Sequence, residues 1–446
     1  MFQSAAEIFD AIASGAVETL TRPASGTRDR RAELAERFEH VRTATAVLCA
    51  PLSPEDAVVQ SMPDASPAKW HLAHTTWFFE TFVLAGARPG RAPFHPGYSY
   101  LFNSYYENVG ARHARPERGL LTRPSLDEVR AYRAAVEREL ADWLHAAPRE
   151  GDARLLDVLE LGLAHEEQHQ ELLVTDVKHL LSRNPLDPVY LAARAPTAGA
   201  AAPLAWTRFA AGVRTLGHTG DGFAFDNEGP AHEVHVAAFE LASRPVTCGE
   251  YLEFVEAGGY RDPRWWLSDG WQWVGASGVE APGYWRREED GTWSLFTLAG
   301  RRALCEHEPL AHVSSYEADA YARFREARLP REAEWELAAR EQPPEGHFAD
   351  SGALHPRATP EREDGTPAAL FGDVWEWTQS PYVAYPGYRP AAGALGEYNG
   401  KFMANQMVLR GGSCATPPGH VRATYRNFFP PTARWQFSGL RLARDA

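Results

Sequence analysis

Two histidines four positions apart, His165 and His169, have the spacing in this chain that most directly suggests chemistry. They frame the segment HEEQH (165–169), which fits the H-E-x-x-H pattern of zinc hydrolases. On an α-helix, residues four apart lie on one face about 6 Å apart, so both imidazoles point the same way. Leu161 and Leu172, about one turn to either side, predict that this face is turned inward. Two buried imidazoles need polar partners: a shared metal ion is one solution and ordinary hydrogen bonds are the other.

The hydrolase interpretation of HEEQH would make Glu166 the general base. The middle positions of such a helix normally pack against apolar neighbours, whereas Glu167 and Gln168 are both polar. Gln168 is close to the ligand face, and we expect it to form a hydrogen-bonding wall of the site. Glu166 is then expected to support a ligand from behind or to lie at the surface.

A third ligand is best supplied by KWHLAHTTWFF (69–79). His74 precedes the inward-looking Trp77 and Phe78 and is the preferred candidate, with His71 in reserve. Three neutral imidazoles without a carboxylate leave three positions open in an octahedral site. That suits Fe(II) binding a thiolate, a second substrate and dioxygen. A tetrahedral zinc hydrolase site is the competing use of three histidines.

The elements that must position these residues are helices in the first part of the chain. Apolar residues recur at helical spacing in 33–49, 67–84, 126–146 and 154–182. Long helices joined by loops predict a bundle over 1–191. Ser66 is expected to cap the second helix, and Pro67 suits its first turn.

The composition and the hydrophobic pattern of the chain change near residue 204. The stretch of small residues before it, 192–203, is expected to be a linker. Gly, Pro and Trp become frequent, 232–241 alternates like a strand, and short helices are expected at 249–259 and 315–327. The fold class is therefore multi-domain α and α+β, with a helical bundle at 1–191 and an α+β domain at 204–446.

Composition narrows the function classes. The chain has 446 residues, 44% of them hydrophobic, and a formal charge of −14, which argues against nucleic acid or an anionic membrane as the main partner. No apolar run approaches the roughly 20 residues that a membrane helix needs, and the first residues lack a basic secretory signal. Four scattered cysteines favour free thiols in a reducing cytoplasm: Cys49, Cys248, Cys305 and Cys414.

The two halves resemble one known family when they are taken together. HLAHTTWFFE followed by HEEQHQELL resembles the DinB-like four-helix bundle of the ergothioneine-pathway sulfoxide synthases. The second half resembles the formylglycine-generating-enzyme type of C-type-lectin-like domain. The segments that carry this resemblance are RPVTCGEYLEFV (244–255), HVSSYEADAYARF (312–324), LPREAEWELAAR (329–340), GDVWEWTQSPY (372–382), VLRGGSCAT (408–416) and RATYRNFFPPTARWQFSGLRLA (422–443).

The resemblance implies an enzyme that uses Fe(II) and O₂ to join a sulfur donor to C2 of the imidazole of hercynine, giving a sulfoxide. It implies the iron ligands His74, His165 and His169, which are the residues that the spacing favours. Gln168 matches the glutamine that hydrogen-bonds the hercynine imidazole. The site is expected where the bundle meets the lectin-like domain. The implied partners are small molecules, with no nucleic acid and no membrane; the oligomeric state is left open.

One departure from the better-known actinobacterial branch concerns the catalytic tyrosine, which that branch places in the C-terminal domain. FNSYYENVG (102–110) resembles instead a second branch in which adjacent tyrosines act at the iron. Tyr105 and Tyr106 are therefore candidate proton donors, the alternative being that the pair only packs the loop. Where the actinobacterial branch has a Trp-Asp pair after RN, this chain has Phe428 and Phe429.

Substrate recognition has candidates in both halves. Arg115 and Arg118 follow the tyrosines and suit the carboxylate of a sulfur donor, unless they are solvated loop arginines. Phe428 and Phe429 offer faces to the trimethylammonium group, with Asn427 beside them.

Three rival functions remain open. A selenoxide synthase would join a selenosugar to hercynine, but such a donor has no carboxylate for the arginines, which favours cysteine or γ-glutamylcysteine. A zinc hydrolase or DinB-like thiol transferase and a metal-free binding module are the others. Formylglycine generation is disfavoured because Cys248, Cys305 and Cys414 show no evident pairing.

Overall fold

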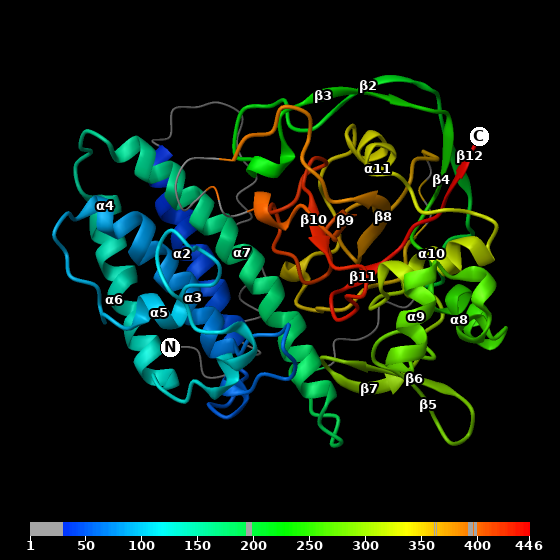
Figure 1. Cartoon of the computed structure of the whole chain (residues 1–446), viewed down its shortest axis with the longest axis horizontal. Helices are drawn as coiled ribbons and strands as arrows, with labels where there is room; N and C mark the ends of the chain where they lie inside the picture. Colours follow the sequence, from blue (N-terminus) through cyan, green and yellow to red (C-terminus); the bar gives the residue numbers. More distant parts are fainter. Residues whose placement is uncertain (1–29, 193–198, 361, 363, 391–395, 397–398) are drawn as a thin grey trace. The chain divides into compact units, whose positions relative to one another are not determined.

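The computed structural model describes residues 30–192, 199–360, 362, 364–390, 396 and 399–446 (Figure 1). The described residues divide into two compact units, one of residues 30–185 with residue 396 and the other of the described residues from 186 to 390 with 399–446. The division falls a few residues before the end of the bundle expected at 191, and Tyr190 and Leu191 both donate backbone hydrogen bonds to Leu298. Residues 193–198 of the predicted linker lie outside the described residues.

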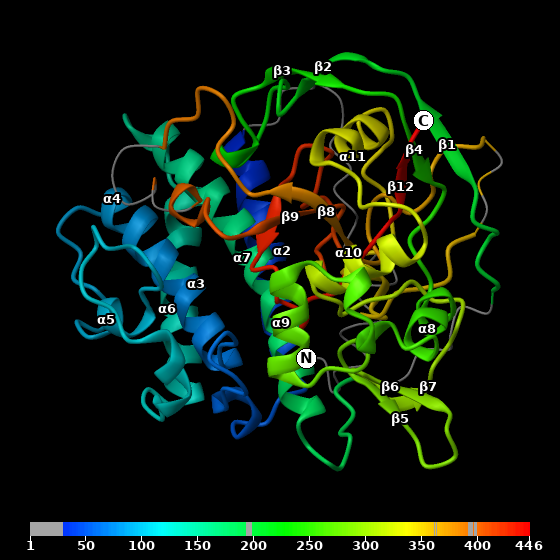
Figure 2. The ribbon, with the colours of Figure 1, turned by 45° about the vertical axis from the view of Figure 1, so that its right-hand side comes forward.

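The described part of the first unit is built on long helices that run side by side (Figures 1 and 2). They are α2 Arg30–Cys49, α3 Ala68–Phe79, α6 Leu126–His145 and α7 Asp152–Ser182. Helices α2 and α3 each pack against both α6 and α7. The helical periodicity of the sequence is thus confirmed in all four segments.

Helix α3 is buried along its whole length, and its polar residues other than the histidines are hydrogen-bonded: Lys69 donates to the carbonyls of Leu121 and Pro124, and Thr76 donates to Leu72. It packs closely on α7 at Gly162. A Cβ at Gly162 would lie 2.6 Å from Phe79 Cε1 and 2.9 Å from Phe78 Cε1, so only glycine permits this approach. The contact brings the two histidine-bearing helices together.

The start of α3 differs from the prediction. Pro67 is the N-cap residue and no side chain caps the helix. The backbone N–H of Ser66 donates to Asp176 Oδ2 at 2.8 Å, and its hydroxyl accepts a hydrogen bond from Arg118 at 2.9 Å. The expected Ser66 cap is wrong because tertiary partners engage both polar groups of this residue.

A short connection follows α3 and leads to the predicted tyrosines. One π-helical turn, η2 Glu80–Leu84, is followed by α4 Ala85–Ala87, α5 Tyr98–Phe102 and the 3₁₀ helix η3 Arg115–Leu120. Glu80 holds the connection in place by accepting hydrogen bonds from Arg91 and from the hydroxyl of Tyr132 on α6. The connection between α4 and α5 is thereby fixed to the bundle.

The second unit is a set of small sheets, mostly antiparallel, with short helices. Its sheets have the strand orders β1-β4-β12, β10-β9-β8-β11, β2-β3 and β5-β6-β7. The strands are β1 Trp206–Phe209, β2 Gly212–Leu216, β3 His232–Val236, β4 Phe239–Ala242, β5 Trp285–Arg287, β6 Trp293–Thr297, β7 Gly300–Ala303, β8 Trp375–Pro381, β9 Met407–Arg410, β10 Asn427–Phe429, β11 Ser438–Gly439 and β12 Ala443–Asp445. The strand predicted at 232–241 is two strands, β3 and β4, in different sheets.

The helices of the second unit include both that the sequence predicts. They are α8 Cys248–Glu256, α9 Ser268–Ser277, α10 Ser315–Phe324 and α11 Glu332–Ala339. Capping boxes start α8 at Thr247 and α10 at Ser314, each with a glutamate three residues on. All four cysteines of the chain are free thiols. Among the described helices, none has the length and apolar character needed to cross a membrane.

Candidate metal centre

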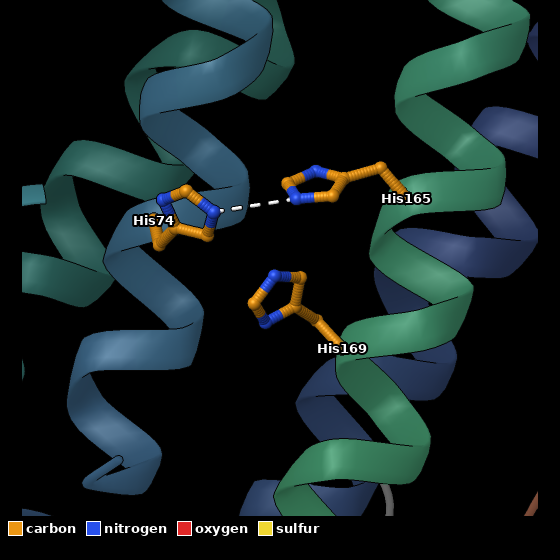
Figure 3. Close-up of side chains that lie close together, drawn as sticks. All are labelled: His74, His165 and His169. Atoms are coloured by element: carbon orange, nitrogen blue, oxygen red, sulfur yellow. Dashed lines mark hydrogen bonds between the residues drawn. The ribbon is translucent and has the colours of Figure 1, made fainter. Parts of the chain in front are cut away.

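Three imidazoles converge between α3 and α7, with His74 on α3 and His165 and His169 on α7 (Figure 3). Each offers a nitrogen that lies within 4.8 Å of those of the other two. The ring centroids of His74 lie 5.0 Å from His165 and 4.7 Å from His169, and the two α7 rings are 4.6 Å apart. The structure thus brings together the three histidines that the sequence favoured as candidate ligands.

The tautomer of His74 is set by the backbone. Its Nδ1 lies 2.6 Å from the carbonyl oxygen of Phe102, which accepts only, so Nδ1 carries the hydrogen. The Nε2 of His74 therefore has a free lone pair and faces His165 Nε2 at 3.3 Å (Figure 3). A ligating histidine usually donates its other N–H to a carbonyl or carboxylate in this way.

All three rings are held in the neutral state. Burial lowers the pKa of His165 to about 3, against an opposing effect of the Glu166 charge. Burial, and then the neighbouring His165, place the pKa of His74 well below its ordinary value. The pKa of His169 is lowered in the same way by burial and by His165 and His74. Neutral imidazoles keep a lone pair for a metal at physiological pH.

These donors fit a divalent transition metal. The imidazoles share one small volume, carry no charge and leave room in the coordination sphere for further ligands, because no carboxylate belongs to the group. Zinc and iron both accept such a set. His74, His165 and His169 are the residues that would hold the ion.

Glu166 is fully buried, and its side chain contacts α2 and α6 instead of joining this cluster. Its carboxylate accepts hydrogen bonds from Arg42 and Arg133 at 2.8 Å each and from Thr45 at 2.7 Å. Burial alone would raise the pKa of Glu166, but the charges of Arg133 and Arg42 outweigh it and lower the pKa. The surface position that the sequence allowed is wrong, and a carboxylate held by two arginines is a poor general base.

The reserve ligand His71 lies behind His169 and is not one of the three converging donors. Its Nδ1 is 2.8 Å from His169 Nδ1, and its Nε2 is 3.1 Å from Asp176 Oδ2. His71 and Asp176 are both buried. His71 therefore contacts His169, a candidate ligand, and does not belong to the three imidazoles that converge.

The predicted tyrosines belong to a loop that is tied to His74. Phe102, whose carbonyl meets His74, directly precedes Asn103, and the Asn103 side chain bonds the backbone of Tyr106 at both N and O, at 3.0 and 2.9 Å. The Tyr106 ring is buried 5.7 Å from Trp77 and 5.2 Å from Phe82. Tyr105 is half-buried with its ring 4.6 Å from that of Tyr106. Tyr106 therefore lies next to Trp77, whose ring stacks on His74 at 5.7 Å, and Tyr105 contacts Tyr106.

The two predicted arginines have different surroundings. Arg115 is exposed and donates to the backbone carbonyl of Asp64. Arg118 is buried, lies 3.4 Å over the Trp70 ring, and donates to Ser66 and Ser104. Among the described residues Arg118 forms no ion pair, and its Nε has no hydrogen-bond partner. Burial is the main reason why its pKa lies well below the ordinary value.

Trp70 connects this arginine to the histidine cluster. One ring contact joins it to the Arg118 guanidinium, and its ring stacks on His74 at 4.5 Å and 14°.

Gln168 is partly exposed on α7 next to His169. Leu161 and Leu172, expected to mark the buried face, are only half-buried.

The remaining predicted residues belong to the second unit, on β10. Phe428 stacks on Tyr382 with centroids 4.0 Å apart, and Phe429 meets Trp435 edge to face at 6.0 Å. The side-chain oxygen of Asn427 accepts a hydrogen bond from the N–H of Phe428. All three are half-buried, and their part in substrate binding stays a prediction.

Sequence reasoning missed several residues around the histidines: Phe102, Asn103, Trp70 and Asp176. Asp176 lies seven residues after His169, which is two helical turns, so helical periodicity could have placed it on the ligand face. The backbone carbonyl of Phe102 has no sequence signal.

Comparisons with known proteins agree with this two-part organisation. Residues 37–173 match the DinB superfamily, and residues 205–366 and 368–446 match the sulfatase-modifying factor enzyme 1-like domain. A "Hercynine oxygenase" of Mycobacterium tuberculosis is 34% identical over 405 residues, which cover 86% of this chain and 92% of that protein. One of the same name from Mycolicibacterium thermoresistibile is 32% identical over 444 residues, covering 93% and 95%.

A third relative, "Ergothioneine biosynthesis protein 1" of Schizosaccharomyces pombe, is 27% identical over 238 residues. That match spans 50% of this chain and 28% of the yeast protein. The resemblance read from the motifs is confirmed over most of the chain: it belongs to the hercynine oxygenase family, with a DinB-like helical unit followed by a sulfatase-modifying-factor-like unit.

Proposed function

We propose that this chain catalyses Fe(II)- and O₂-dependent formation of a C–S bond between imidazole C2 of hercynine and a thiol donor. The donor is cysteine or γ-glutamylcysteine, and the product is the sulfoxide used in ergothioneine biosynthesis. The observation that carries the proposal is the group of three neutral imidazoles from two helices, in a chain related to hercynine oxygenases along most of its length.

The reaction balances with dioxygen as the sole oxidant. The C2–H bond of hercynine and the S–H bond of the donor are broken, and a C–S bond and an S=O bond form. One oxygen atom enters the sulfoxide, and the other leaves as water with the two hydrogens. Four electrons pass from the two substrates to O₂, so no external reductant is required.

His74, His165 and His169 would hold the Fe(II), which would supply a binding position for the thiol and for dioxygen. The protein's share is to place the reactants and protons around it. Gln168, beside His169, is proposed to hydrogen-bond the hercynine imidazole and turn C2 toward the sulfur.

Arg118 is proposed to bind the carboxylate of the sulfur donor. Folding has already removed the Arg118 guanidinium from water, so binding an anion adds no further desolvation of the arginine. Its Nε–H also has no partner inside the fold and can donate to the anion. Trp70 holds its plane by cation–π contact and stacks at the same time on His74. Arg115 is proposed only as an outer contributor, because it is exposed.

Tyr105 and Tyr106 are proposed as proton donors during sulfur oxidation. The Asn103 side chain fixes the backbone of Tyr106 by two hydrogen bonds. The carbonyl of Phe102, the residue before Asn103, is bonded to His74, so few residues separate the tyrosines from a candidate metal ligand. A phenol gives up a proton or a hydrogen atom. Replacing both tyrosines by phenylalanine should divert O₂ to simple thiol oxidation, whereas full sulfoxide yield would exclude them.

A selenium donor is the second candidate within this chemistry. A selenosugar has no carboxylate, so the unpaired Arg118 favours the amino-acid thiol. The zinc hydrolase alternative is disfavoured because Glu166, its general base, is bound by Arg42 and Arg133.

The test is anaerobic reconstitution with Fe(II), followed by exposure to air with hercynine and, in parallel, cysteine, γ-glutamylcysteine and selenol donors. Mass spectrometry identifies the product, and an oxygen electrode measures consumption. We expect O₂ uptake that needs both substrates, and a hercynine sulfoxide. Hydrolysis with zinc, or no coupling with any donor after stoichiometric Fe(II) loading, would contradict the proposal.

A further inference from the structure

The metal ligands differ in what fixes the hydrogen on the ring nitrogen that faces away from the metal. His74 donates from Nδ1 to a backbone carbonyl. His169 has no such carbonyl among its described contacts, and its Nδ1 meets another imidazole, His71, at 2.8 Å. Two imidazole nitrogens can share one hydrogen bond in either direction, so this contact by itself leaves the tautomer of His169 undetermined.

Asp176 removes the ambiguity. Its carboxylate accepts hydrogen bonds only, so His71 Nε2, 3.1 Å away, must carry a hydrogen. In neutral His71 the Nδ1 is then an acceptor, and His169 Nδ1 must be the donor. The hydrogen of His169 is thereby placed away from the metal position, and its Nε2 keeps a lone pair.

The carboxylate itself is oriented by the chain entering α3. Asp176 Oδ2 accepts a second hydrogen bond from the Ser66 N–H at 2.8 Å, and both Asp176 and His71 are buried. His71 lies in the first turn of α3, and His169 and Asp176 lie two turns apart on α7. The same two helices carry the three candidate ligands.

We infer that Asp176, His71 and His169 form a hydrogen-bonded relay in which Asp176 and His71 are positioning residues that select the metal-binding tautomer of His169. This inference rests on the proposed metal centre and adds to it the groups that prepare one ligand. Outer partners of this kind change metal affinity by about 10–100-fold when they are removed.

The matched variants are His71→Leu, which removes both nitrogens at similar volume, and His71→Gln, whose amide can donate to Asp176 and accept from His169. Asp176→Leu removes the other end of the relay and serves if His71→Leu does not fold. The probe is Co(II), titrated into the full-length, metal-stripped protein under anaerobic conditions and followed by its visible absorption.

We expect His71→Leu and Asp176→Leu to weaken Co(II) binding about 10–100-fold, with His71→Gln restoring most of the affinity. The second readout is independent of metal: long-range ¹H–¹⁵N spectra of the ¹⁵N-histidine-labelled apoprotein report the tautomer of His169. We expect hydrogen on Nδ1 in wild type and His71→Gln, and on Nε2 in a measurable fraction of His71→Leu.

A wild-type His169 with its hydrogen on Nε2 would overturn the relay, and so would unchanged Co(II) affinity in both leucine variants. Failure of the wild type to bind Co(II) or Fe(II) would overturn the proposed function instead. In that case the tautomer spectra still decide the relay, so the two failures are distinguishable.

Discussion

Arg118 in the first unit differs from the buried arginines of the second unit in the partners that it has. In the second unit, Arg410, Arg426 and Arg441 are buried and each is bound to a carboxylate: Arg410 to Glu332 and Glu336, Arg426 to Glu332, and Arg441 to Glu376. In the first unit, Arg118 is buried to a similar degree, yet it has two serine hydroxyls and a Trp ring for partners and no ion pair among the described residues.

The difference separates arginines whose charge is balanced inside the fold from one, Arg118, that we propose binds a substrate carboxylate. Desolvating a cation costs several kcal/mol, which an internal carboxylate offsets in the second unit. For Arg118 that offset is missing from the folded chain, so an external anion can supply it. Helix α7 shows the same contrast within one element, because Glu166 is bound by arginines while His165 next to it faces the neutral cluster.

The largest effect is expected for His165→Ala. Removing one of three converging nitrogens should abolish stoichiometric Fe(II) loading and coupling activity, while the apoprotein keeps its thermal stability within about 1–2 kcal/mol. Metal analysis after anaerobic reconstitution measures the loading. The control is His179→Ala on the same helix, whose ring bonds Ser61 outside the cluster and should load normally. Full iron content in His165→Ala would refute the site.

Arg441→Gln should produce the largest loss of stability. It leaves the fully buried carboxylate of Glu376 without its cation, which typically costs about 3–5 kcal/mol. Urea unfolding followed by tryptophan fluorescence measures the change. The control is Arg444→Gln, which breaks the half-exposed pair with Glu240 and should cost about 0–1 kcal/mol. Equal losses in both variants would remove the distinction between buried pairs and surface pairs.

Asp373 is the exception in the second unit, because it is a buried carboxylate with no ion pair among the described residues. Burial raises its pKa to about 7, against the opposing hydrogen bond from the Arg357 N–H. The folded state therefore binds more protons than the unfolded state between about pH 4 and pH 7, and stability falls as pH rises through that window.

Asp373→Asn should remove this dependence. The amide oxygen can still accept from Arg357, and asparagine tolerates the positive φ of 53°. We expect the variant to be roughly 2–4 kcal/mol more stable than wild type near pH 8 and nearly equal to it near pH 4. Denaturant unfolding across this range measures the difference. A pH-independent difference would show that Asp373 is charged in the folded wild type.

Arg118→Gln should have the smallest effect on stability and a clear effect on substrate. Removing the Arg118 charge leaves no buried carboxylate unpaired. The unfolding free energy should therefore change less in Arg118→Gln than in Arg441→Gln. The KM for the thiol donor should rise about 10–100-fold, the equivalent of about 1.5–3 kcal/mol for a charge-assisted hydrogen bond. Steady-state kinetics with hercynine saturating give the value. Arg115→Gln, at an exposed position, is the control; a wild-type KM in Arg118→Gln would show its charge to be structural.

Local pattern was sufficient for the four long helices and for the candidate metal ligands. Helical periodicity gave all four long helices, and the four-residue spacing of His165 and His169 placed both on one face. Strand alternation was misleading at 232–241, because it continued across the break between β3 and β4. Alternation records which side of a strand is buried and carries no information on which sheet the strand joins.

The sequence by itself determined the two-part organisation, the family and His74, His165 and His169 as the convergent donors, because these depend on residue type and short-range spacing. Only the tertiary structure decided that Ser66 bonds Asp176 and Arg118 instead of capping α3, and that Glu166 is buried between Arg42 and Arg133. The physical reason is that a polar side chain takes its best partner from whatever the packing brings near. Those partners are tens of residues away in sequence, beyond the reach of any local pattern.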